Sequence, residues 1–333
     1  MTTSVSVLVA VHNAAPYLGQ CLDSLLAQSI ENIQILCMDD CSTDNSWEIL
    51  QDYARRDARV EIFQMPENSG QAKARNELIR HARGKFVTFL DSDDWMAPDT
   101  LENFVKIFDE HDDADCVLLR VLKIDENGTE TDYDKPIPPS LTGFEAFKAS
   151  LTWDIHGCYA ARREFFEQWP YDDTCRSYSD DNSTRQHYYH SRRVYYAPDA
   201  RYFYRQNADS TTHRVSVRRY DFLRANTSMK RQLIELNVGE EILDIYENVR
   251  WLNCVGLYLF YYQNRQSMSA ADNAYGLQEI KSVWRSIEAK RLRPRNRYKL
   301  GYVPLQWSWR LFRVEEEIYF FLRSIKNRWK NIA

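Results

Sequence analysis

Short apolar runs alternate with amphipathic stretches over the first 90 residues of the chain. The runs VSVLVAV, IQILCM, VEIFQ and KFVTFL are rich in β-branched and aromatic residues, which is typical of short buried strands. Between the first two runs, Leu18, Leu22 and Leu25 recur at helical spacing. Four alternations of strand and helix predict an α/β fold with a mostly parallel sheet and right-handed crossovers. We place its first strands at 5–11, 33–38, 60–64 and 85–90.

Local signals mark the expected ends of the helices between these strands. Pro16 suits the first turn of the first helix. Ser42 or Thr43 is expected to cap the second helix, and Gly84 is expected to end the third.

The rest of the chain divides into a mixed region and a helical region. After the fourth strand the pattern predicts a helix, a strand over 115–124, and then a polar hairpin or loop. An aromatic-rich mixed segment follows, and from about residue 217 the sequence favours helices. We therefore predict two domains: residues 1–213, which bind the ligand and carry the chemistry, and a helical region over 214–333.

Composition excludes several classes of protein. With 43 basic and 48 acidic residues the net charge is −5, so there is no global basic footprint for nucleic acid. The charge is uneven, because residues 291–333 hold eleven Lys and Arg against three Glu.

The seven cysteines form no C-x-x-C pair, which favours a reducing compartment. With no signal-peptide pattern and no run near the ~20 apolar residues of a membrane span, we expect a cytoplasmic protein.

Carboxylates follow two of the predicted strands. Asp40 comes after the second strand, while Asp91, Asp93 and Asp94 follow the fourth in the stretch FLDSDDW. Because ligands of such sheets bind beyond the carboxyl ends of the strands, these side chains are expected to share a crevice. Two carboxylates at i and i+2 can reach one hard cation such as Mg²⁺ or Mn²⁺. A solvated turn with an aspartate capping the next helix is the alternative.

Two other acidic motifs do not fit this stretch. A calcium loop needs an oxygen ligand at Trp95 and a glycine at Met96, and the chain has neither. A phosphatase of the haloacid dehalogenase type expects Thr or Val where Trp95 stands, and normally carries its motif on the first strand.

Five segments in order resemble the family 2 glycosyltransferases, which have the GT-A fold. They are VSVLVAVHNAAPYLGQCLDSLLAQS, ILCMDDCSTDNS, NSGQAKARNELIRHARGKFVTFLDSDDW, SYSDDNSTRQHY and YFYRQNADSTT. The first three are highly specific together and cover about residues 4–100, and the last two extend the resemblance more loosely to about residue 213. The chain departs from the family pattern at AVHN, where Pro-Val-Tyr-Asn is common, and at DCS, where Asp-Gly-Ser is common.

The resemblance implies a nucleotide-sugar site with a divalent cation, Mn²⁺ or Mg²⁺. Asp40 falls on the carboxylate that accepts the uracil N–H, although an N-cap role would also explain it. Asp91 and Asp93 match the D-x-D pair that holds ribose and metal, with Asp93 the more direct ligand and Asp94 in support. Arg75 is either a diphosphate partner or an internal ion pair. The other implied donor-side residues are Ala10, Val11, His12, Asn68, Gly70, Lys73, Asn76 and Ser92.

The resemblance also supplies a second carboxylate for catalysis. Inverting sugar transfer needs a general base on the face opposite the leaving diphosphate. Asp181 in YSDDNST falls on that position, with Asp180 as its neighbour. An acidic pair that simply favours a helix N-terminus is the alternative. His213 is a candidate for the diphosphate or the metal, or it is structural.

The basic C-terminal stretch has two interpretations. Apolar residues that share one predicted helical face, with Arg and Lys beside them, suit an anionic membrane surface. The alternatives are a helix that packs within its own domain and a homodimer interface. The residues of this face are Leu311, Val314, Ile318, Phe321, Leu322, Ile325 and Trp329.

We therefore expect an inverting glycosyltransferase. It would take a sugar from a nucleotide donor, UDP-linked by family resemblance, to a glycan or lipid-linked acceptor in surface polysaccharide or lipopolysaccharide synthesis. The expected location is the cytoplasm, with the inner face of the cell membrane as a further site of contact. A nucleotidyltransferase usually carries a Gly-rich basic loop after the first strand, where this chain has HNAAPY. A non-catalytic nucleotide-sugar-binding assembly protein is the third interpretation, and the full set of aspartates counts against it.

Overall fold

The computed structural model describes residues 4–133, 136–206, 215–297 and 307–330. It contains two compact units, Met1–His213 and Arg214–Ala333.

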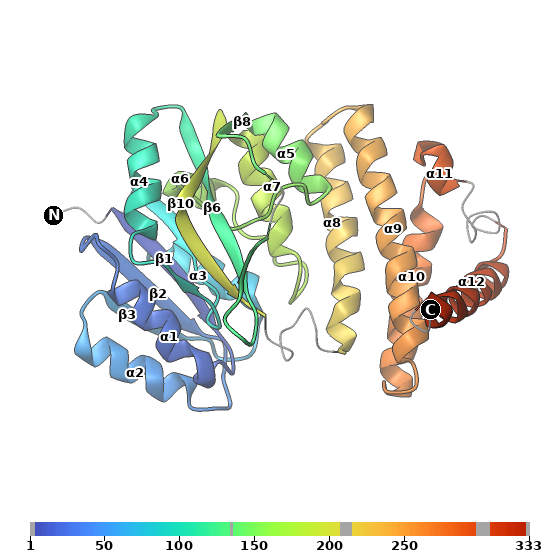
Figure 1. Cartoon of the computed structure of the whole chain (residues 1–333), viewed down its shortest axis with the longest axis horizontal. Coiled ribbons are helices and arrows are strands. Elements are labelled where there is room, and N and C mark those ends of the chain that lie inside the picture. The colour runs from blue at the N-terminus through green and yellow to red at the C-terminus, as the bar shows by residue number, and fades with distance from the viewer. Residues whose placement is uncertain (1–3, 134–135, 207–214, 298–306, 331–333) are drawn as a thin grey trace. The chain divides into compact units, whose positions relative to one another are not determined.

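The first unit is built on one mixed sheet (Figure 1). Its strands are β1 (Val5–Val11), β2 (Ile33–Asp39), β3 (Val60–Gln64), β4 (Phe86–Phe89), β5 (Trp95–Met96), β6 (Ala114–Ile124), β7 (Glu130–Asp132), β8 (Ser140–Thr142), β9 (Tyr159–Arg162) and β10 (Arg193–Arg205).

The strand order is β3-β2-β1-β4-β9-β6-β10-β5, with β7 paired to β6 and β8 paired to β10. The strands β3, β2, β1 and β4 are mutually parallel, while β9 runs antiparallel to both β4 and β6. The predicted α/β class with a mostly parallel sheet is therefore confirmed. The chain moves outward from β1 to β3 and then returns to the other side of β1 as β4, which makes the β1–β4 junction the topological switch.

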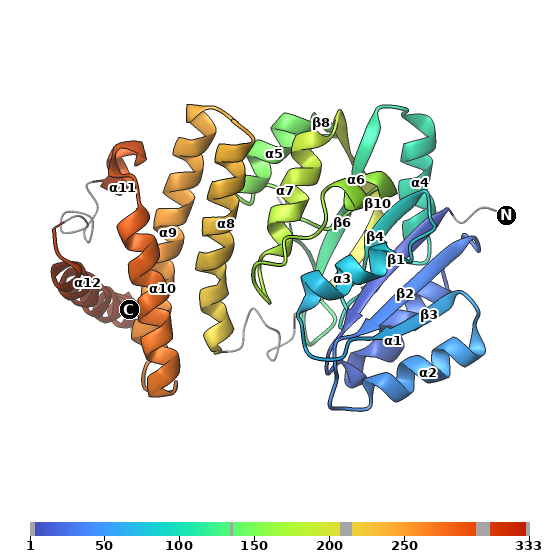
Figure 2. The ribbon, with the colours of Figure 1, turned by 180° about the vertical axis from the view of Figure 1, so that it is seen from behind.

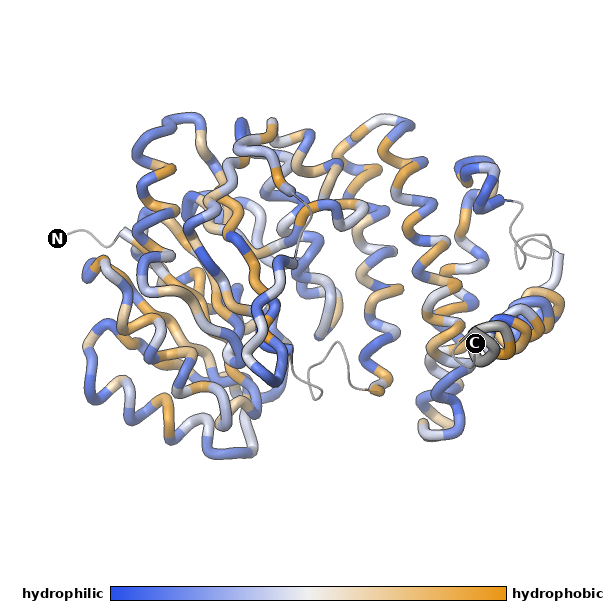
Figure 3. The backbone as a smooth tube through the Cα atoms, viewed as in Figure 1, coloured by the Kyte–Doolittle hydropathy of each residue, from blue (hydrophilic) through white to orange (hydrophobic). Residues whose placement is uncertain are grey.

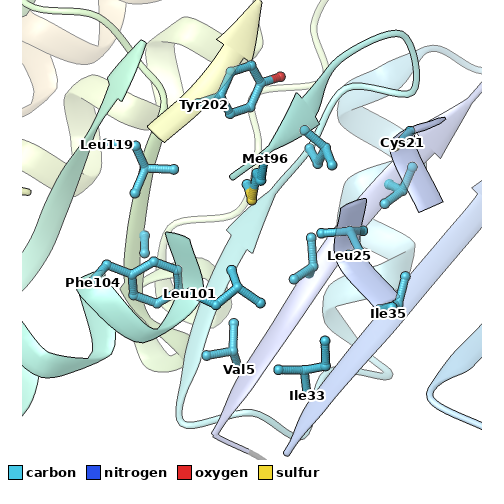
Figure 4. Packing of buried hydrophobic residues seen from close by; sticks show 14 of the residues in the cluster. Val5, Cys21, Leu25, Ile33, Ile35, Met96, Leu101, Phe104, Leu119 and Tyr202 are labelled. Atoms are coloured by element: carbon cyan, nitrogen blue, oxygen red, sulfur yellow. The ribbon is translucent and has the colours of Figure 1, made fainter. Parts of the chain in front are cut away.

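Helices cover both faces of this sheet. They are α1 (Ala15–Leu26), α2 (Ser46–Arg56), α3 (Gln71–Ile79), α4 (Thr100–Glu110), α5 (Gly143–Leu151), α6 (Arg163–Gln168) and α7 (Asp180–His190). Alternate residues of β1, including Val5, pack with Leu25 of α1 and with Leu101 and Phe104 of α4 in one buried cluster (Figure 4). Figure 2 shows α3 on the opposite face. The buried core therefore holds the carboxyl ends of the strands in fixed positions.

Two helix ends differ from the sequence predictions. The second helix begins at Ser46 with Asn45 as its N-cap, so neither Ser42 nor Thr43 caps it. The Asp39 carboxylate instead accepts the Ser42 amide at 3.2 Å, and this contact keeps the residues before α2 in a loop.

Gly84 does not end the third helix, because α3 stops at Ile79 with Arg80 as its C-cap. A Cβ at Gly84 would lie 2.4 Å from the backbone nitrogen of Ser6. This glycine is therefore needed for close approach to β1.

The second unit is helical in its described residues. It comprises η1 (Val217–Tyr220), α8 (Asp221–Glu235), α9 (Glu240–Asn264), α10 (Ala270–Ser286), η2 (Ala289–Arg291), α11 (Pro294–Arg297) and α12 (Trp309–Lys330). Its core gathers large aromatic side chains from α9, α10 and α12, among them Trp251, Tyr258, Trp284 and Phe312. Within the described ranges no helix is both long and apolar enough to cross a membrane.

Candidate functional site

A buried aspartate anchors the loop that leads into α3. Asp40, which directly follows β2, is 4% exposed. One of its carboxylate oxygens accepts the Ser69 amide at 2.7 Å, and the other accepts the Gly70 amide at 2.8 Å. Since the N-cap of α2 is Asn45, Asp40 does not cap that helix. Each carboxylate oxygen retains a further lone pair that could accept a ligand N–H.

His12 lies against the same loop. Ala10 and Val11 end β1, and His12 follows with its ring exposed. The ring nitrogen Nδ1 is 2.9 Å from the Asp40 carbonyl oxygen, and the Asn68 amide nitrogen lies within 3.1 Å of both ring nitrogens. The structure thus brings these predicted nucleoside-side residues together at the carboxyl ends of β1 and β2.

The turn after β4 gives its carboxylates different surroundings. Asp94 is 1% exposed and accepts the Tyr202 hydroxyl and the Arg205 amide, each at 2.8 Å, which ties the turn to β10. Asp93, by contrast, receives no side-chain hydrogen bond from the described residues. Burial and the neighbouring charge of Asp91 raise the pKa of the Asp93 carboxyl to about 6. An ionised Asp93 would therefore be stabilised by a cation.

Arg75 joins the turn after β4 to the start of α7. Its guanidinium is buried, with Nη2 2.6 Å from Oδ1 of Asp91 and Nη1 3.3 Å from Oδ2 of Asp180. It also lies 4.1 Å from the centroid of the Phe89 ring. Burial opposes its charge, but the two carboxylates outweigh this effect and raise the pKa of Arg75. The sequence left two roles open for Arg75, a diphosphate partner and an internal ion pair. These contacts are those of an internal ion pair.

The segment before α7 is docked onto α3. The Asn76 side chain accepts the Tyr171 amide at 2.7 Å and donates to the Tyr171 carbonyl at 2.9 Å. Gly70 has φ +93°, and a Cβ at this position would lie 2.9 Å from Cα of Arg176. Both the backbone conformation and the close approach therefore require glycine.

The two carboxylates at the start of α7 differ in their partners. Asp180 pairs with Arg75, whereas Asp181 forms no ion pair within the described part of the chain. Burial, reinforced by the charge of Asp180, raises the pKa of Asp181 to about 7, against the opposing charges of Arg185 and Arg75. A carboxylate with a pKa near the working pH suits a general base.

The groups near Asp91 that could hold a cation are carboxylate oxygens. Oδ1 of Asp91 already accepts Gln71 and Arg75, each at 2.6 Å, while its Oδ2 has no partner among the described residues. No group of three His, Cys, Asp or Glu in those residues could enclose a metal ion. Two carboxylates fit Mg²⁺ or Mn²⁺, which commonly complete their coordination with phosphate oxygens and water. His213 lies outside the described residues.

Lys73 and Ser92 have no side-chain hydrogen bond or ion pair with described residues. Lys73 is exposed in the first turn of α3, where helix amides and a cation are natural partners for phosphate. Ser92 is partly exposed between Asp91 and Asp93. Both side chains are therefore available to a ligand.

Two residues support the site although sequence reasoning gave neither a role. Gln71 holds Asp91, as described above. Arg205 donates from Nε to the Asp93 carbonyl at 2.8 Å, and its guanidinium lies 4.6 Å from the Trp95 ring centroid. The YFYR segment was the available signal for Arg205, whereas Gln71 carries no signal beyond its place at a helix start.

We expect Arg75→Met to lower the free energy of unfolding by about 3 kcal/mol at pH 8, because it leaves two carboxylates without their buried cation. Urea unfolding measures this change. Arg80→Met at the C-cap of the same helix is the control, since the Arg80 side chain is 75% exposed and, among the described residues, forms an ion pair only with Glu77. It should change stability by less than about 0.5 kcal/mol. Equal effects of the two substitutions would contradict the bridging role of Arg75.

The sheet order and the acidic edge define the GT-A class of nucleotide-binding folds, and a solved structure supports this assignment. The crystal structure of S. aureus TarS 1–349 in complex with UDP-GlcNAc superimposes with a TM-score of 0.74 at 20% identity, covering 95% of this chain and 91% of that one. Residues 6–169 match the model for glycosyl transferase family 2. This region of the chain is therefore similar to that family.

Two curated relatives are similar over shorter stretches. The uncharacterized glycosyltransferase EpsJ of Bacillus subtilis is 28% identical over 227 residues, which are 64% of each chain. The poly(ribitol-phosphate) beta-glucosyltransferase of Bacillus spizizenii is 32% identical over 161 residues, which are 44% of this chain and 25% of that protein. The chain thus spans less than two thirds of the length of the curated relatives it matches.

Proposed function

We propose that the protein is a metal-dependent inverting glycosyltransferase that moves a sugar from a UDP-linked donor to a surface-glycan acceptor. The observation that carries this proposal is the Arg75 bridge, which sets the acidic turn of Asp91 and Asp93 beside the paired carboxylates of Asp180 and Asp181. A cation site and a base at one sheet edge are what such a transfer needs. The family and the names of the relatives support the donor and acceptor classes.

On the donor side, Asp40 would accept the uracil N–H, with His12 beside the base. Lys73 and the first amides of α3 would contact the diphosphate. Asp91 and Asp93 would hold Mg²⁺ or Mn²⁺, which neutralises negative charge on a leaving diphosphate when bound.

On the acceptor side, Asp181 would remove the proton of the attacking hydroxyl. The hydroxyl oxygen then forms a bond to the anomeric carbon while the bond from that carbon to the diphosphate breaks, so the configuration inverts. Arg75 fixes Asp180, and the negative charge of Asp180 helps to keep the pKa of Asp181 near neutrality. Asp180 and Arg75 are therefore positioning residues.

A donor panel tests this function. Nucleotide sugars are first ranked by the melting temperature of the protein, since a ligand stabilises the folded state that binds it. Nucleotide release is then measured with Mn²⁺ or Mg²⁺ and with chelator. We expect one donor class to raise the melting temperature and to be turned over only with metal. Absence of both effects across the panel would refute the proposal.

The second unit offers a surface for the membrane contact predicted from sequence. We call this surface the α12 apolar face. Each of its residues is at least 38% exposed: Leu311, Val314, Ile318, Phe321, Leu322 and Ile325. Phe312 and Phe320 of the same helix point into the core and are at most 4% exposed. Figure 3 shows apolar positions recurring along α12. The predicted apolar face is therefore not the face that packs within the unit.

We propose an anionic membrane surface as the partner of the α12 apolar face. Arg310 and Arg323 are exposed on the same helix, and residues 291–333 carry a net charge of +8. Apolar residues beside basic ones bind the interface of anionic bilayers. Such contact would place the protein at the inner face of the cell membrane, close to a lipid-linked acceptor.

Flotation with vesicles containing phosphatidylserine tests the membrane contact. We expect the protein to float with these vesicles, and Ile318→Asp to reduce its recovery at least fivefold, because a charge in the centre of the face opposes insertion. Ser324→Asp adds the same charge off this face and should retain most of the binding. Equal recovery with neutral and anionic vesicles would refute the proposal, and dimerisation that Ile318→Asp abolishes would assign the face to a second copy.

A further inference from the structure

Few large apolar side chains are exposed in the first unit. Among its described residues they are Tyr133, Phe144 and Trp153, with 38%, 46% and 42% of their surface exposed. Two of these three lie around a small hollow beside Asp181. Trp153 lines the hollow together with Asp181, and Tyr133 contacts His156, which lines the hollow as well. Exposed aromatic side chains that gather beside a proposed base indicate a surface for a ligand.

Trp153 stands at a backbone position that glycine usually occupies. Helix α5 ends in a Schellman motif, in which the Trp153 amide donates to the Ser150 carbonyl at 3.3 Å. The Asp154 amide donates to the Ala149 carbonyl at 3.0 Å. Trp153 has φ +60°, which glycine adopts freely and a bulky residue adopts with strain. Because such strain is concentrated at functional sites, the indole at this position points to a role beyond ending the helix.

Tyr133 is held at the carboxyl edge of the sheet. Its amide donates to the Val121 carbonyl of β6 at 3.0 Å. Its ring meets the Tyr204 ring edge-on, with 6.3 Å between the centroids, and Nζ of Lys123 lies 4.3 Å from its centroid. Tyr204 and Lys123 are paired near the ends of the parallel strands β10 and β6. Tyr133 therefore lies at the edge of the sheet that also carries the acidic turn.

His156 separates the two exposed aromatic rings. It is 4% exposed, its Nδ1 accepts the Cys158 amide at 3.0 Å, and its carbonyl accepts the Tyr188 hydroxyl of α7 at 3.0 Å. Its ring meets the Tyr133 ring edge-on, with 6.2 Å between the centroids. Because His156 lies between Tyr133 and the hollow that Trp153 lines, the two exposed rings form separate platforms rather than one apolar patch.

Two aromatic platforms with polar groups between them suit an oligosaccharide. Each sugar ring has an apolar face that can pack on an aromatic ring, and hydroxyl groups that need polar partners. Lys123 and Asp181 offer such partners beside Tyr133 and Trp153 respectively. A lipid chain would instead require a continuous apolar groove. Since the hollow is too small to admit a sugar ring, a glycan would lie across its mouth.

We propose that Trp153 and Tyr133 bind two sugar units of an oligosaccharide acceptor. This inference rests on the proposed function and narrows the acceptor from a surface glycan of any length to a chain of at least two sugars. Trp153 holds the unit with the reacting hydroxyl, because it lines the hollow together with Asp181. Tyr133 holds a unit farther from the base, because His156 separates it from the hollow.

Binding of neutral sugars by saturation-transfer NMR on the full chain tests this surface without requiring turnover. The probes are methyl β-glucoside and N-acetylglucosamine, with the matching tetramers cellotetraose and chitotetraose. We expect at least one tetramer to bind about three- to tenfold more tightly than its monomer, because a second aromatic contact adds to the first. UDP with Mn²⁺ should leave that tetramer bound, whereas displacement would place it in the donor site and overturn the proposal.

Trp153→Gly separates a binding role from a structural one. Glycine relieves the left-handed strain, so the variant should melt no lower than the original protein. It should nevertheless bind the tetramer about three- to tenfold more weakly. A lower melting temperature with unchanged tetramer binding would assign Trp153 to the structure of the turn and overturn the proposal.

Tyr133→Ala tests the second platform. It should weaken the tetramer by a similar factor and leave the monomer unchanged, since only the unit farther from the base contacts Tyr133. Phe144→Ala is the matched control, because it removes the third exposed aromatic side chain, at the opposite end of α5 from Trp153. It should alter the binding of neither probe.

Equal binding of monomers and tetramers, or no binding of either tetramer, would overturn the proposal. So would tetramer binding that Trp153→Gly and Tyr133→Ala both leave unchanged. Nucleotide release without acceptor, measured in parallel on the original protein, reports on the proposed function instead. Its absence, together with tetramer binding that depends on Tyr133, would count against glycosyl transfer and not against the sugar-binding surface.

Discussion

Asp181→Asn should strongly slow sugar transfer while the donor still binds. The amide has nearly the same shape as the carboxylate but cannot accept the proton of the acceptor hydroxyl. General-base catalysis contributes about 10²–10⁴-fold, so we expect kcat for transfer to fall by that factor, with KM for the donor within about twofold of the original. Steady-state kinetics with a fixed acceptor measure both. Asp173→Asn, at an exposed position before α7, is the matched control.

The pH dependence of transfer gives a second test of the same residue. Burial, reinforced by the charges of Asp180 and Asp91, raises the pKa of Asp181 to about 7, against the opposing charges of Arg185 and Arg75. Transfer by the original protein should therefore rise with pH up to about 7 and then level off, because the base must be ionised. The residual rate of Asp181→Asn should lack this rise. The same pH profile in both proteins would show that Asp181 does not take the proton.

The raised pKa of Asp181 also predicts that, as pH rises, the stability of the protein falls while its activity increases. The folded protein retains the Asp181 proton up to about pH 7, whereas an unfolded chain loses it near pH 4. The contribution of Asp181 to stability therefore falls as pH rises from about 4 to about 7, and it stays unfavourable above that range. Asp181→Asn should melt no lower than the original protein at pH 8.

Asp93→Ala should reduce metal-dependent nucleotide release at least a hundredfold. The substitution removes the carboxylate that receives no side-chain hydrogen bond from the described residues, and with it the more direct of the two proposed metal ligands. Because burial and Asp91 raise the pKa of Asp93 to about 6, an ionised Asp93 opposes folding at pH 8 in the absence of metal. The variant should therefore lose activity without losing thermal stability.

The control for Asp93→Ala is Asp109→Ala, which removes an exposed carboxylate of α4 and should alter neither property. Full activity of Asp93→Ala would refute its role at the metal. Loss of activity accompanied by a large fall in melting temperature would instead assign Asp93 to the structure of the turn.

Much of the fold was predictable because its signals are local. The β-branched runs give β1 to β4, and their parallel order sets Asp40 and Asp91 at one edge without any knowledge of packing. Gly70 connects them in the structure: its amide binds Asp40, and the next residue, Gln71, binds Asp91. The start of α2 was not predictable, because the Asp39 carboxylate holds the Ser42 amide in a loop that propensity alone does not reveal.

The contacts that support the candidate site were harder to predict from the sequence. Sequence could offer two roles for Arg75, but the choice depends on Asp180, which lies 105 residues further along the chain. On α12, the period of the apolar residues was clear, but only the packing of Phe312 and Phe320 shows which face the unit leaves exposed.

The most direct test of the metal-dependent site is Mn²⁺ binding followed by electron paramagnetic resonance. The signal of free Mn²⁺ is recorded during titration of the protein with and without UDP. We predict that the original protein removes about one equivalent of Mn²⁺ from solution when UDP is present, because two carboxylates alone leave most of the coordination to phosphate and water. Asp93→Ala should leave the Mn²⁺ signal at its free value. Equal Mn²⁺ binding by both proteins in the presence of UDP would contradict the account.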